Sequence, residues 1–147
     1  MQSYAPAVRK GTIMTKKEEA IALHDKKYNC AQAVACAFSK EANVDISTLF
    51  KACEGLGLGM GGMCGTCGAV SGAVMLAGFV NSDGAVDNPG TKADTYKISK
   101  EITNRFEEKN GSLICKELKG IETGTVLRSC PGCIEDAVEI VQDVLNL

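Results

Sequence analysis

The feature that most limits how this chain can fold is a long apolar stretch at residues 67–80, interrupted only by Ser71. Its 14 residues fall short of the roughly 18 that suggest a membrane-spanning helix, so we expect no transmembrane segment. Gly68 and Gly72 lie four residues apart beside a stripe of alanines, which lets other helices approach this one closely. The stretch therefore predicts a central, buried, Gly/Ala-rich helix.

The segments around this stretch also have helical signals. Asn29 is the expected N-cap of one helix, and Pro131 the expected first residue of the last, strongly amphipathic one. Because no convincing alternation with a period of two is present, we predict an all-α fold, a single compact bundle of about five helices. Residues 1–14 have no periodicity and are expected to form a mobile N-terminal arm. Residues 15–147 are expected to form one helical domain. The helices are expected near residues 15–27, 30–41, 47–53, 67–80, 91–110 and 131–145.

Charge and the N-terminal sequence restrict the classes of function. Sixteen Lys and Arg against 18 Asp and Glu give a net charge of −2 with no long basic run, so we expect no nucleic-acid binding. The N-terminus has no apolar segment typical of a secretory signal, so we expect a cytoplasmic protein with reduced thiols. In that compartment, eight cysteines in 147 residues indicate metal binding or redox chemistry more than structural disulfides.

Two pairs of cysteines have a spacing that suits shared chemistry. Cys64 and Cys67 are separated by two residues, and so are Cys130 and Cys133. Near a helix start, such a pair can bind one metal ion with both sulfurs, or it can form a disulfide. The spacing is compatible with either chemistry.

Four cysteines fall where we expect helices to begin: Cys30, Cys67 and Cys130 at predicted helix starts, and Cys115 at the start of a short turn. The unpaired N–H groups and the dipole at a helix N-terminus lower the pKa of a thiol. This position favours the thiolate, which is the form that binds a metal and attacks a disulfide.

Other polar and cysteine residues are expected to be structural. Cys36 and Cys53 are predicted to lie in the core, and His24 to be solvated in a polar turn. The glycine-rich residues 57–62 match G-x-G-x-x-G, but a helix rather than a strand precedes them, which argues against dinucleotide binding. We expect them to place backbone N–H groups near Cys64 and Cys67.

The cysteines and their neighbours together resemble the family of redox-active proteins named for its C…GCAxxG…C…C pattern. The resemblance spans nearly all of residues 15–147, and the order and spacing of the cysteine blocks agree with those of the family. A related domain occurs in split-Soret cytochromes, which are dimeric and associated with an iron–sulfur centre, so the resemblance implies electron transfer. The chain has no Cys-x-x-Cys-His motif and a single histidine, which excludes covalent c-type haem. The matching blocks are residues 28–34, 67–72, 112–118 and 130–131.

The first hypothesis is a protein that passes single electrons to a redox partner protein of unknown identity. An iron–sulfur cluster would be its cofactor, since thiolates suit iron and the apolar helix would shield the site from water. The family pattern implies four ligands, and the two close pairs add Cys64 and Cys133 as further candidates. The four are Cys30, Cys67, Cys115 and Cys130.

Two other hypotheses stay open. One is a dithiol–disulfide oxidoreductase, in which Cys130 is the attacking catalytic thiol and Cys133 the resolving one. The other is a non-catalytic module with a zinc ion or no metal at all. We also expect the protein to form a homodimer in which the small-residue surface of residues 68–77 is buried.

Overall fold

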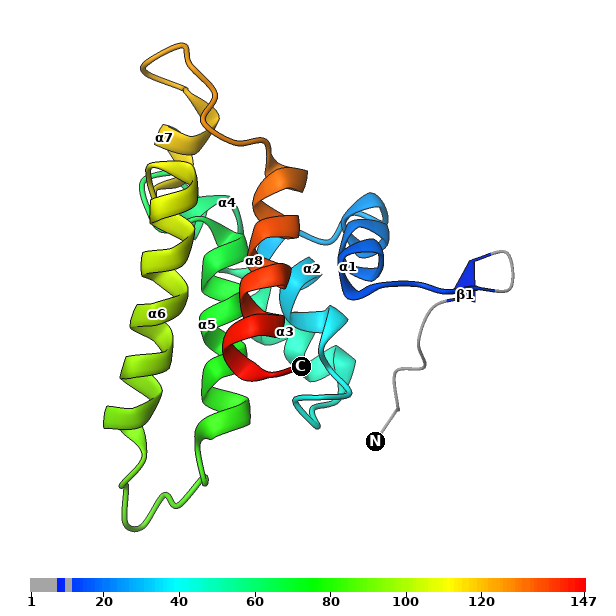
Figure 1. Ribbon diagram of the computed structural model, residues 1–147, viewed down its shortest axis with the longest axis vertical. Helices are drawn as coiled ribbons and strands as arrows, with labels where there is room; N and C mark the ends of the chain where they lie inside the picture. Colours follow the sequence, from blue (N-terminus) through cyan, green and yellow to red (C-terminus); the bar gives the residue numbers. More distant parts are fainter. Residues whose placement is uncertain (1–7, 10–11) are drawn as a thin grey trace.

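Helices are the main secondary structure of the described part of the protein. The computed structural model describes residues 8–9 and 12–147, and within them only two short strands, β1 (Val8–Arg9) and β2 (Thr12–Ile13), pair as an antiparallel ribbon beside the bundle (Figure 1). The predicted all-α fold is confirmed. The expected arm, residues 1–14, lies mostly outside the described residues. The helices are α1 (Lys16–Asp25), α2 (Cys30–Ala37), α3 (Ile46–Glu54), α4 (Gly57–Met60), α5 (Gly68–Asn81), α6 (Lys92–Asn110), α7 (Cys115–Lys119) and α8 (Cys130–Leu145).

The prediction of about five helices was too low. The helices α4 and α7 have only 4 and 5 residues, which is too short for a hydrophobic period to show in the sequence. The last helix also begins one residue earlier than expected, because Ser129 Oγ accepts the Gly132 N–H at 3.1 Å and so caps α8. This cap places Cys130, rather than Pro131, at the first helical position.

The predicted cap at Asn29 is present and fixes where α2 begins. The Asn29 side chain accepts the backbone N–H of Gln32, and the Gln32 side chain accepts that of Asn29, both at 2.9 Å. These two bonds form a capping box. As a result, Cys30 is the first residue of α2, at the end of the helix where backbone N–H groups are free.

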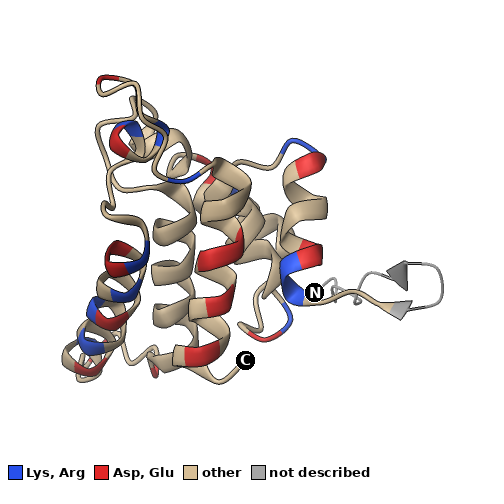
Figure 2. Ribbon diagram, turned by 45° about the horizontal axis from the view of Figure 1, so that its top comes forward, with Lys and Arg blue, Asp and Glu red and all other residues tan. Residues whose placement is uncertain are grey.

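The centre of the bundle is formed by α2 and α5 together. Residues 31–37 of α2 are all buried, and the helix is enclosed by α1, α3, α5 and α8. The apolar helix α5 packs on α2, α6 and α8 and carries no charged residue, whereas Figure 2 shows charges along α6 and α8. The predicted Gly/Ala-rich helix is therefore at the centre, but it shares that place with α2.

Two glycines let α5 cross α2 with the backbones in contact. A Cβ at Gly72 would lie 2.6 Å from the carbonyl oxygen of Ala31, and one at Gly68 would lie 3.2 Å from the Ala31 nitrogen. The small-residue face predicted for a homodimer is thus already buried against α2 inside one chain. The reason for expecting a dimer through this face does not hold, and the oligomeric state stays a prediction.

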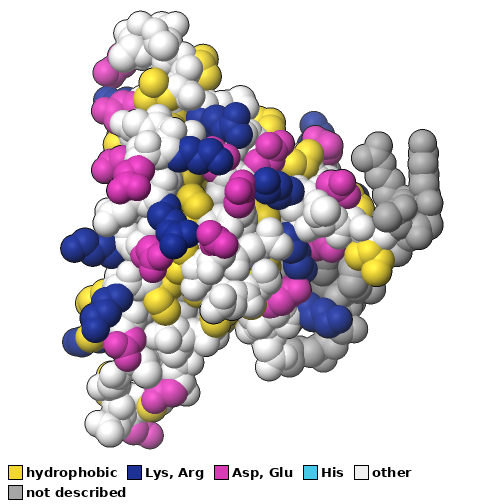
Figure 3. All heavy atoms as spheres, in the orientation of Figure 1, with side chains coloured by type: hydrophobic (Ala, Val, Ile, Leu, Met, Phe, Trp, Pro, Cys, Tyr) yellow, Lys and Arg dark blue, Asp and Glu magenta, His cyan; other side chains and the backbone are white. Residues whose placement is uncertain are grey.

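The outer surface mixes charges of both signs. On the face drawn in Figure 3, basic and acidic side chains alternate with small apolar areas. The helix α6 contributes several of these charges, as its alternating sequence indicates. No helix within residues 8–9 and 12–147 has the length and apolar character to cross a membrane.

Candidate functional site

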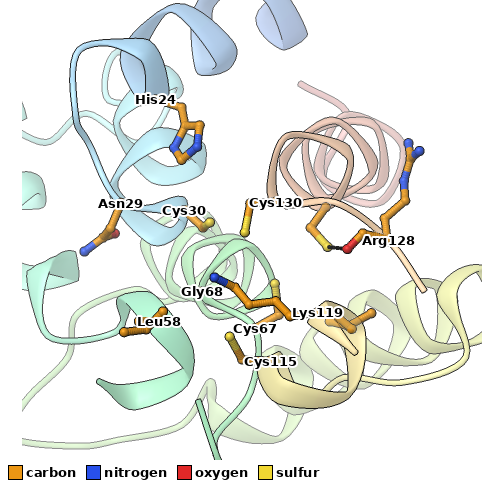
Figure 4. Close-up of a pocket in the computed structure, with 12 residues that line it drawn as sticks. His24, Asn29, Cys30, Leu58, Cys67, Gly68, Cys115, Lys119, Arg128 and Cys130 are labelled. Atoms are coloured by element: carbon orange, nitrogen blue, oxygen red, sulfur yellow. Dashed lines mark hydrogen bonds between the residues drawn. The ribbon is translucent and has the colours of Figure 1, made fainter. Parts of the chain in front are cut away.

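Five of the eight cysteines line one cavity of about 190 Å³. The cavity lies at the end of the bundle where α5 and α8 begin and where α7 is found, at the top of Figure 1. Figure 4 shows the cysteine side chains that it labels around a common space. Leu58 lines the cavity and is 47% exposed, so the cavity reaches the protein surface. The five are Cys30, Cys67, Cys115, Cys130 and Cys133.

The crossing of α2 and α5 brings the first two of these cysteines together. Cys30 opens α2, and Cys67 is the residue directly before α5. Since Gly68 and Gly72 allow the two helices to touch near these ends, the two sulfurs reach the same cavity. Gly72, the last glycine of the Cys-Gly-Ala-x-x-Gly signature, thus helps to position Cys67, the first residue of that signature.

Cys115 is placed by a short antiparallel pairing. The backbone N–H of Cys67 donates to the Leu113 carbonyl at 2.7 Å, and that of Cys115 donates to the Gly65 carbonyl at 3.0 Å. Gly59, at φ +55°, lies so close that a Cβ on it would be 2.4 Å from the Cβ of Cys115. The glycine-rich segment therefore packs on Cys115. It also lies beside the residues next to Cys64 and Cys67, as expected, because the Gly65 N–H donates to the Gly59 carbonyl at 3.0 Å and a Cβ at Gly68 would lie 3.3 Å from the Cα of Gly57.

The start of α8 is anchored by an ion pair between the half-buried Arg128 and the buried Asp136. Arg128 Nε and Nη2 donate to the two carboxylate oxygens of Asp136 at 3.0 and 3.2 Å, and Asp136 is only 2% exposed. Gly132 is in close contact with this arginine: a Cβ at Gly132 would lie only 2.5 Å from Arg128 Nε. The pair fixes the first turn of α8, which carries Cys130 and Cys133.

The thiols interact across helices rather than within the Cys130–Cys133 motif. Hydrogen bonding with the Cys30 thiol lowers the pKa of Cys130 to about 5 against the opposing effect of burial, and Lys119 lowers it as well. The same hydrogen bond, together with burial, raises the pKa of Cys30. The pair therefore holds one proton, and the thiolate is at the first position of α8, as the helix dipole favours.

Cys67 and Cys133 form the second pair. Hydrogen bonding with Cys133 lowers the pKa of Cys67, and the backbone N–H groups of Ala69 and Val70 lower it further, although burial opposes them. The pKa of Cys133 is raised by the same hydrogen bond and by burial. These N–H groups belong to the first turn of α5. Their effect on the pKa of Cys67 agrees with the prediction that a helix N-terminus favours the thiolate.

Lys119 and His24 are among the cavity residues that were not predicted from the sequence. Lys119 extends into the space between the cysteines (Figure 4). Burial raises the pKa of Cys115, and the positive charge of Lys119 acts against this rise. His24 was expected to be solvated, but it is half-buried and lines the cavity. Its Nδ1 lies 3.0 Å from the carbonyl oxygen of Tyr28, so this nitrogen donates the hydrogen bond.

Three cysteines lie outside the cavity. Cys64 is exposed, so the structure does not bring it to Cys67 and the other four thiols. Cys36 and Cys53 are fully buried in the core, as expected, and burial raises the pKa of Cys36 to about 12 and that of Cys53 to about 11. Neither core thiol reaches the site.

The lining suits a thiophilic cofactor larger than one ion. Soft thiolate donors select iron–sulfur clusters, zinc or copper, and none of the described residues that line the cavity is a carboxylate. Within residues 8–9 and 12–147, no three Cys, His, Asp or Glu side chains converge closely enough to hold a single metal ion. The thiols instead surround a volume of about 190 Å³, at least ten times the roughly 10–15 Å³ that one water molecule needs.

Comparison with known proteins gives one match. A sequence model of the family described as "Putative redox-active protein (C_GCAxxG_C_C)" matches residues 28–144, which include all five cavity cysteines. No curated protein and no solved structure matches the chain.

Proposed function

The chain belongs to the family of redox-active proteins with the C_GCAxxG_C_C cysteine pattern, and on this basis we propose that it transfers single electrons through a bound iron–sulfur cluster. The proposed ligands come from four different helix starts, one each from α2, α5, α7 and α8. A redox partner protein would supply or accept the electron. The ligands are Cys30, Cys67, Cys115 and Cys130.

One observation carries this proposal: four thiols surround a common cavity instead of meeting at a point. The four sulfurs of a zinc site each lie about 2.3 Å from a single ion. A space of about 190 Å³ between thiols favours a cluster with several iron and sulfide ions over such a site. Zinc stays the alternative that metal analysis would reveal.

When bound, the cluster supplies iron that can take up and release single electrons. The chain's own groups hold it and set its surroundings. The Cys133 thiol and the backbone N–H groups of Ala69 and Val70 lower the pKa of Cys67, and the Cys133 thiol also donates to the Arg128 carbonyl oxygen at 4.0 Å. Donors of this kind stabilise negative charge on sulfur and so tune the reduction potential.

The apolar packing around the site limits contact with water. Cys67 and Cys115 are 6% and 5% exposed, and Leu118 beside them is 2% exposed. Cys30 and Cys130 are half-buried, which leaves one edge of the site near solvent. An electron would enter or leave through this edge, where a partner protein can approach.

The test is metal analysis of protein purified without oxygen and supplied with iron and sulfide. We expect bound iron and acid-labile sulfide, with a visible sulfur-to-iron band that dithionite bleaches. A Ser substitution at any of the four ligands should lower the iron content, whereas Cys64→Ser should leave it unchanged because Cys64 lies outside the cavity. A spectroscopically silent, iron-free sample would reject the proposal.

A second candidate is dithiol–disulfide exchange, which the contact between Cys30 and Cys130 favours. The Cys130 thiolate would attack a substrate disulfide and release one thiolate, forming a mixed disulfide. Cys30 would then lose its proton and attack the Cys130 sulfur, releasing the second thiolate. The substrate gains two electrons and the protein is left with a disulfide. We therefore propose Cys30, rather than Cys133, as the resolving thiol of this candidate.

Insulin reduction driven by dithiothreitol tests this second candidate. If exchange occurs at this pair, Cys30→Ser should abolish turnover and Cys133→Ser should retain most of it. The opposite pattern would restore the pairing that the Cys-x-x-Cys motif predicts. No turnover by the wild-type protein would remove the candidate.

A further inference from the structure

Lys119 is the basic residue whose side chain extends among the site cysteines. It is the last residue of α7, and Gly120 directly follows it in the left-handed conformation, at φ +69°. A Cβ at Gly120 would lie 2.4 Å from the carbonyl oxygen of Thr125, so this end of α7 is packed tightly against the loop that follows. The backbone of Lys119 is therefore fixed, and its half-buried side chain extends into the cavity (Figure 4).

The partners of this ammonium group are thiols. Among the described residues, no carboxylate lies within 4.0 Å of it, whereas Lys116 one turn earlier pairs with Glu122 at 3.1 Å. Burial and the neighbouring thiols raise the pKa values of Cys30 and Cys115, and Lys119 acts against this rise, while it helps to lower the pKa of Cys130. Three of the four proposed ligands thus experience its positive charge.

A cluster of thiolates in a largely buried cavity needs positive charge nearby. Each buried thiolate is costly unless a cation or hydrogen-bond donors stabilise it. Helix N-termini provide partial charges, and Lys119 adds a full positive charge among these sulfurs. Arg128 also lines the cavity, but its guanidinium group pairs with the Asp136 carboxylate.

We propose that Lys119 is the charge-compensating residue of the site: its ammonium group makes the electrostatic potential at the cavity thiols more positive and thereby raises the reduction potential of the cluster they hold. The second half of this proposal rests on the proposed function. Lys119 acts through the sulfur atoms and the cluster, so it is a positioning residue rather than a ligand.

The redox step that it influences is a one-electron step. When bound, the cluster would take up one electron from an external donor, dithionite in the test, and one ferric iron would become ferrous. The site gains one negative charge, which a nearby ammonium group stabilises. Removing the ammonium group therefore disfavours the reduced state.

The first experiment measures the midpoint potential of the reconstituted protein by spectroelectrochemistry. Lys119→Met keeps the length of the side chain and removes its charge, so we expect a lower midpoint potential with unchanged iron content. Lys119→Arg should stay near the wild-type value because it retains the charge. The matched control is Lys116→Met, which removes a charge outside the cavity and should leave the potential unchanged.

The second experiment needs no cluster. In the reduced, metal-free protein, the alkylation rate of Cys130 is compared for iodoacetate, an anion, and iodoacetamide, its neutral counterpart of similar size. The fraction of thiolate cancels in the ratio of the two rates, which therefore reports the potential at the sulfur. We expect Lys119→Met to lower this ratio about fivefold, which corresponds to about 1 kcal/mol, and Lys116→Met to leave it unchanged.

The outcomes separate the two proposals. A lower ratio together with a lower midpoint potential supports the role of Lys119. An unchanged ratio overturns it whether or not the protein holds iron, and an unchanged potential in an iron-loaded Lys119→Met protein overturns the tuning of the cluster. A wild-type protein without iron and sulfide overturns the proposed function. In that case the ratio of the two alkylation rates alone tests whether Lys119 makes the potential at the thiols more positive.

Discussion

Gly72 gives the sharpest test of how the fold positions the site, because one added methyl group meets backbone rather than a side chain. In Gly72→Ala, the new Cβ would lie 2.6 Å from the Ala31 carbonyl oxygen, against 3.4 Å or more for ordinary van der Waals contact. No rotamer change can relieve this, so α5 must move away from α2. Overpacking of this kind costs about 1–3 kcal/mol.

The matched control lies in the same helix. Gly78→Ala adds the same methyl group where nothing lies within 4 Å, so only the gain in helix propensity remains, about 1 kcal/mol. Gly72→Ala receives the same gain, and it cancels when the two variants are compared. We therefore expect Gly72→Ala to be about 1–3 kcal/mol less stable than Gly78→Ala.

The assay is urea unfolding of the reduced, metal-free proteins, followed by circular dichroism. For a domain of this size, 1 kcal/mol corresponds to about 4 °C in Tm, which gives a second readout. Moving α5 also separates Cys67 from Cys30, so iron uptake by Gly72→Ala should fall while that by Gly78→Ala does not. Equal stability of the two alanine variants would refute the close crossing of α2 and α5.

Three further predictions follow from the site and its anchor. Cys133→Ala should keep its iron but lower the midpoint potential, because Cys67 loses a donor, while Cys133→Ser should stay close to wild type; loss of iron from the alanine variant would instead make Cys133 a ligand. In the metal-free protein, mass spectrometry should find Cys130 alkylated by iodoacetamide at pH 7 well before Cys36, since their pKa values are about 5 and about 12. The Cys130 rate should fall only as the pH drops through about 5, and a rate that still rises steeply between pH 7 and 9 would contradict the thiolate assignment. Asp136→Asn should cost about 1–2 kcal/mol in chemical denaturation at pH 7, because a buried carboxylate that accepts bonds from Arg128 is neutralised. Burial opposes ionisation of Asp136, but these bonds outweigh it and lower its pKa below 3.8, so the stability it contributes is complete above that pH and is lost below it. A stability difference between this variant and wild type that persists unchanged at pH 2.5 would argue against that role.

Much of the site could be predicted because its parts are local. The cap at Asn29 and the apolar period of α8 depend on residues within one or two turns, and they place cysteines at helix starts without reference to the rest of the chain. The same holds for the uncharged helix α5, whose composition alone requires burial. These signals were enough for the all-α fold and for grouping four of the cavity cysteines.

Which thiols face each other could not be predicted in this way. The Cys130-x-x-Cys133 spacing suggests one pair, but in the folded protein Cys130 faces Cys30 and Cys133 faces Cys67. Cys64 has the same spacing from Cys67 and yet is exposed. Spacing fixes how far apart two residues are along a helix, whereas the direction of a sulfur depends on what the helix packs against.

The sequence by itself determined the longer helices, the burial of α5 and the cysteines at the helix starts, because hydrophobic period, capping and the helix dipole act over a few residues. Only the tertiary structure decided that Lys119 and His24 join the cavity, that α2 is as central as α5, and that the thiols pair across helices. Those outcomes depend on contacts between residues far apart in the chain, such as Gly72 against Ala31, and no local pattern records them.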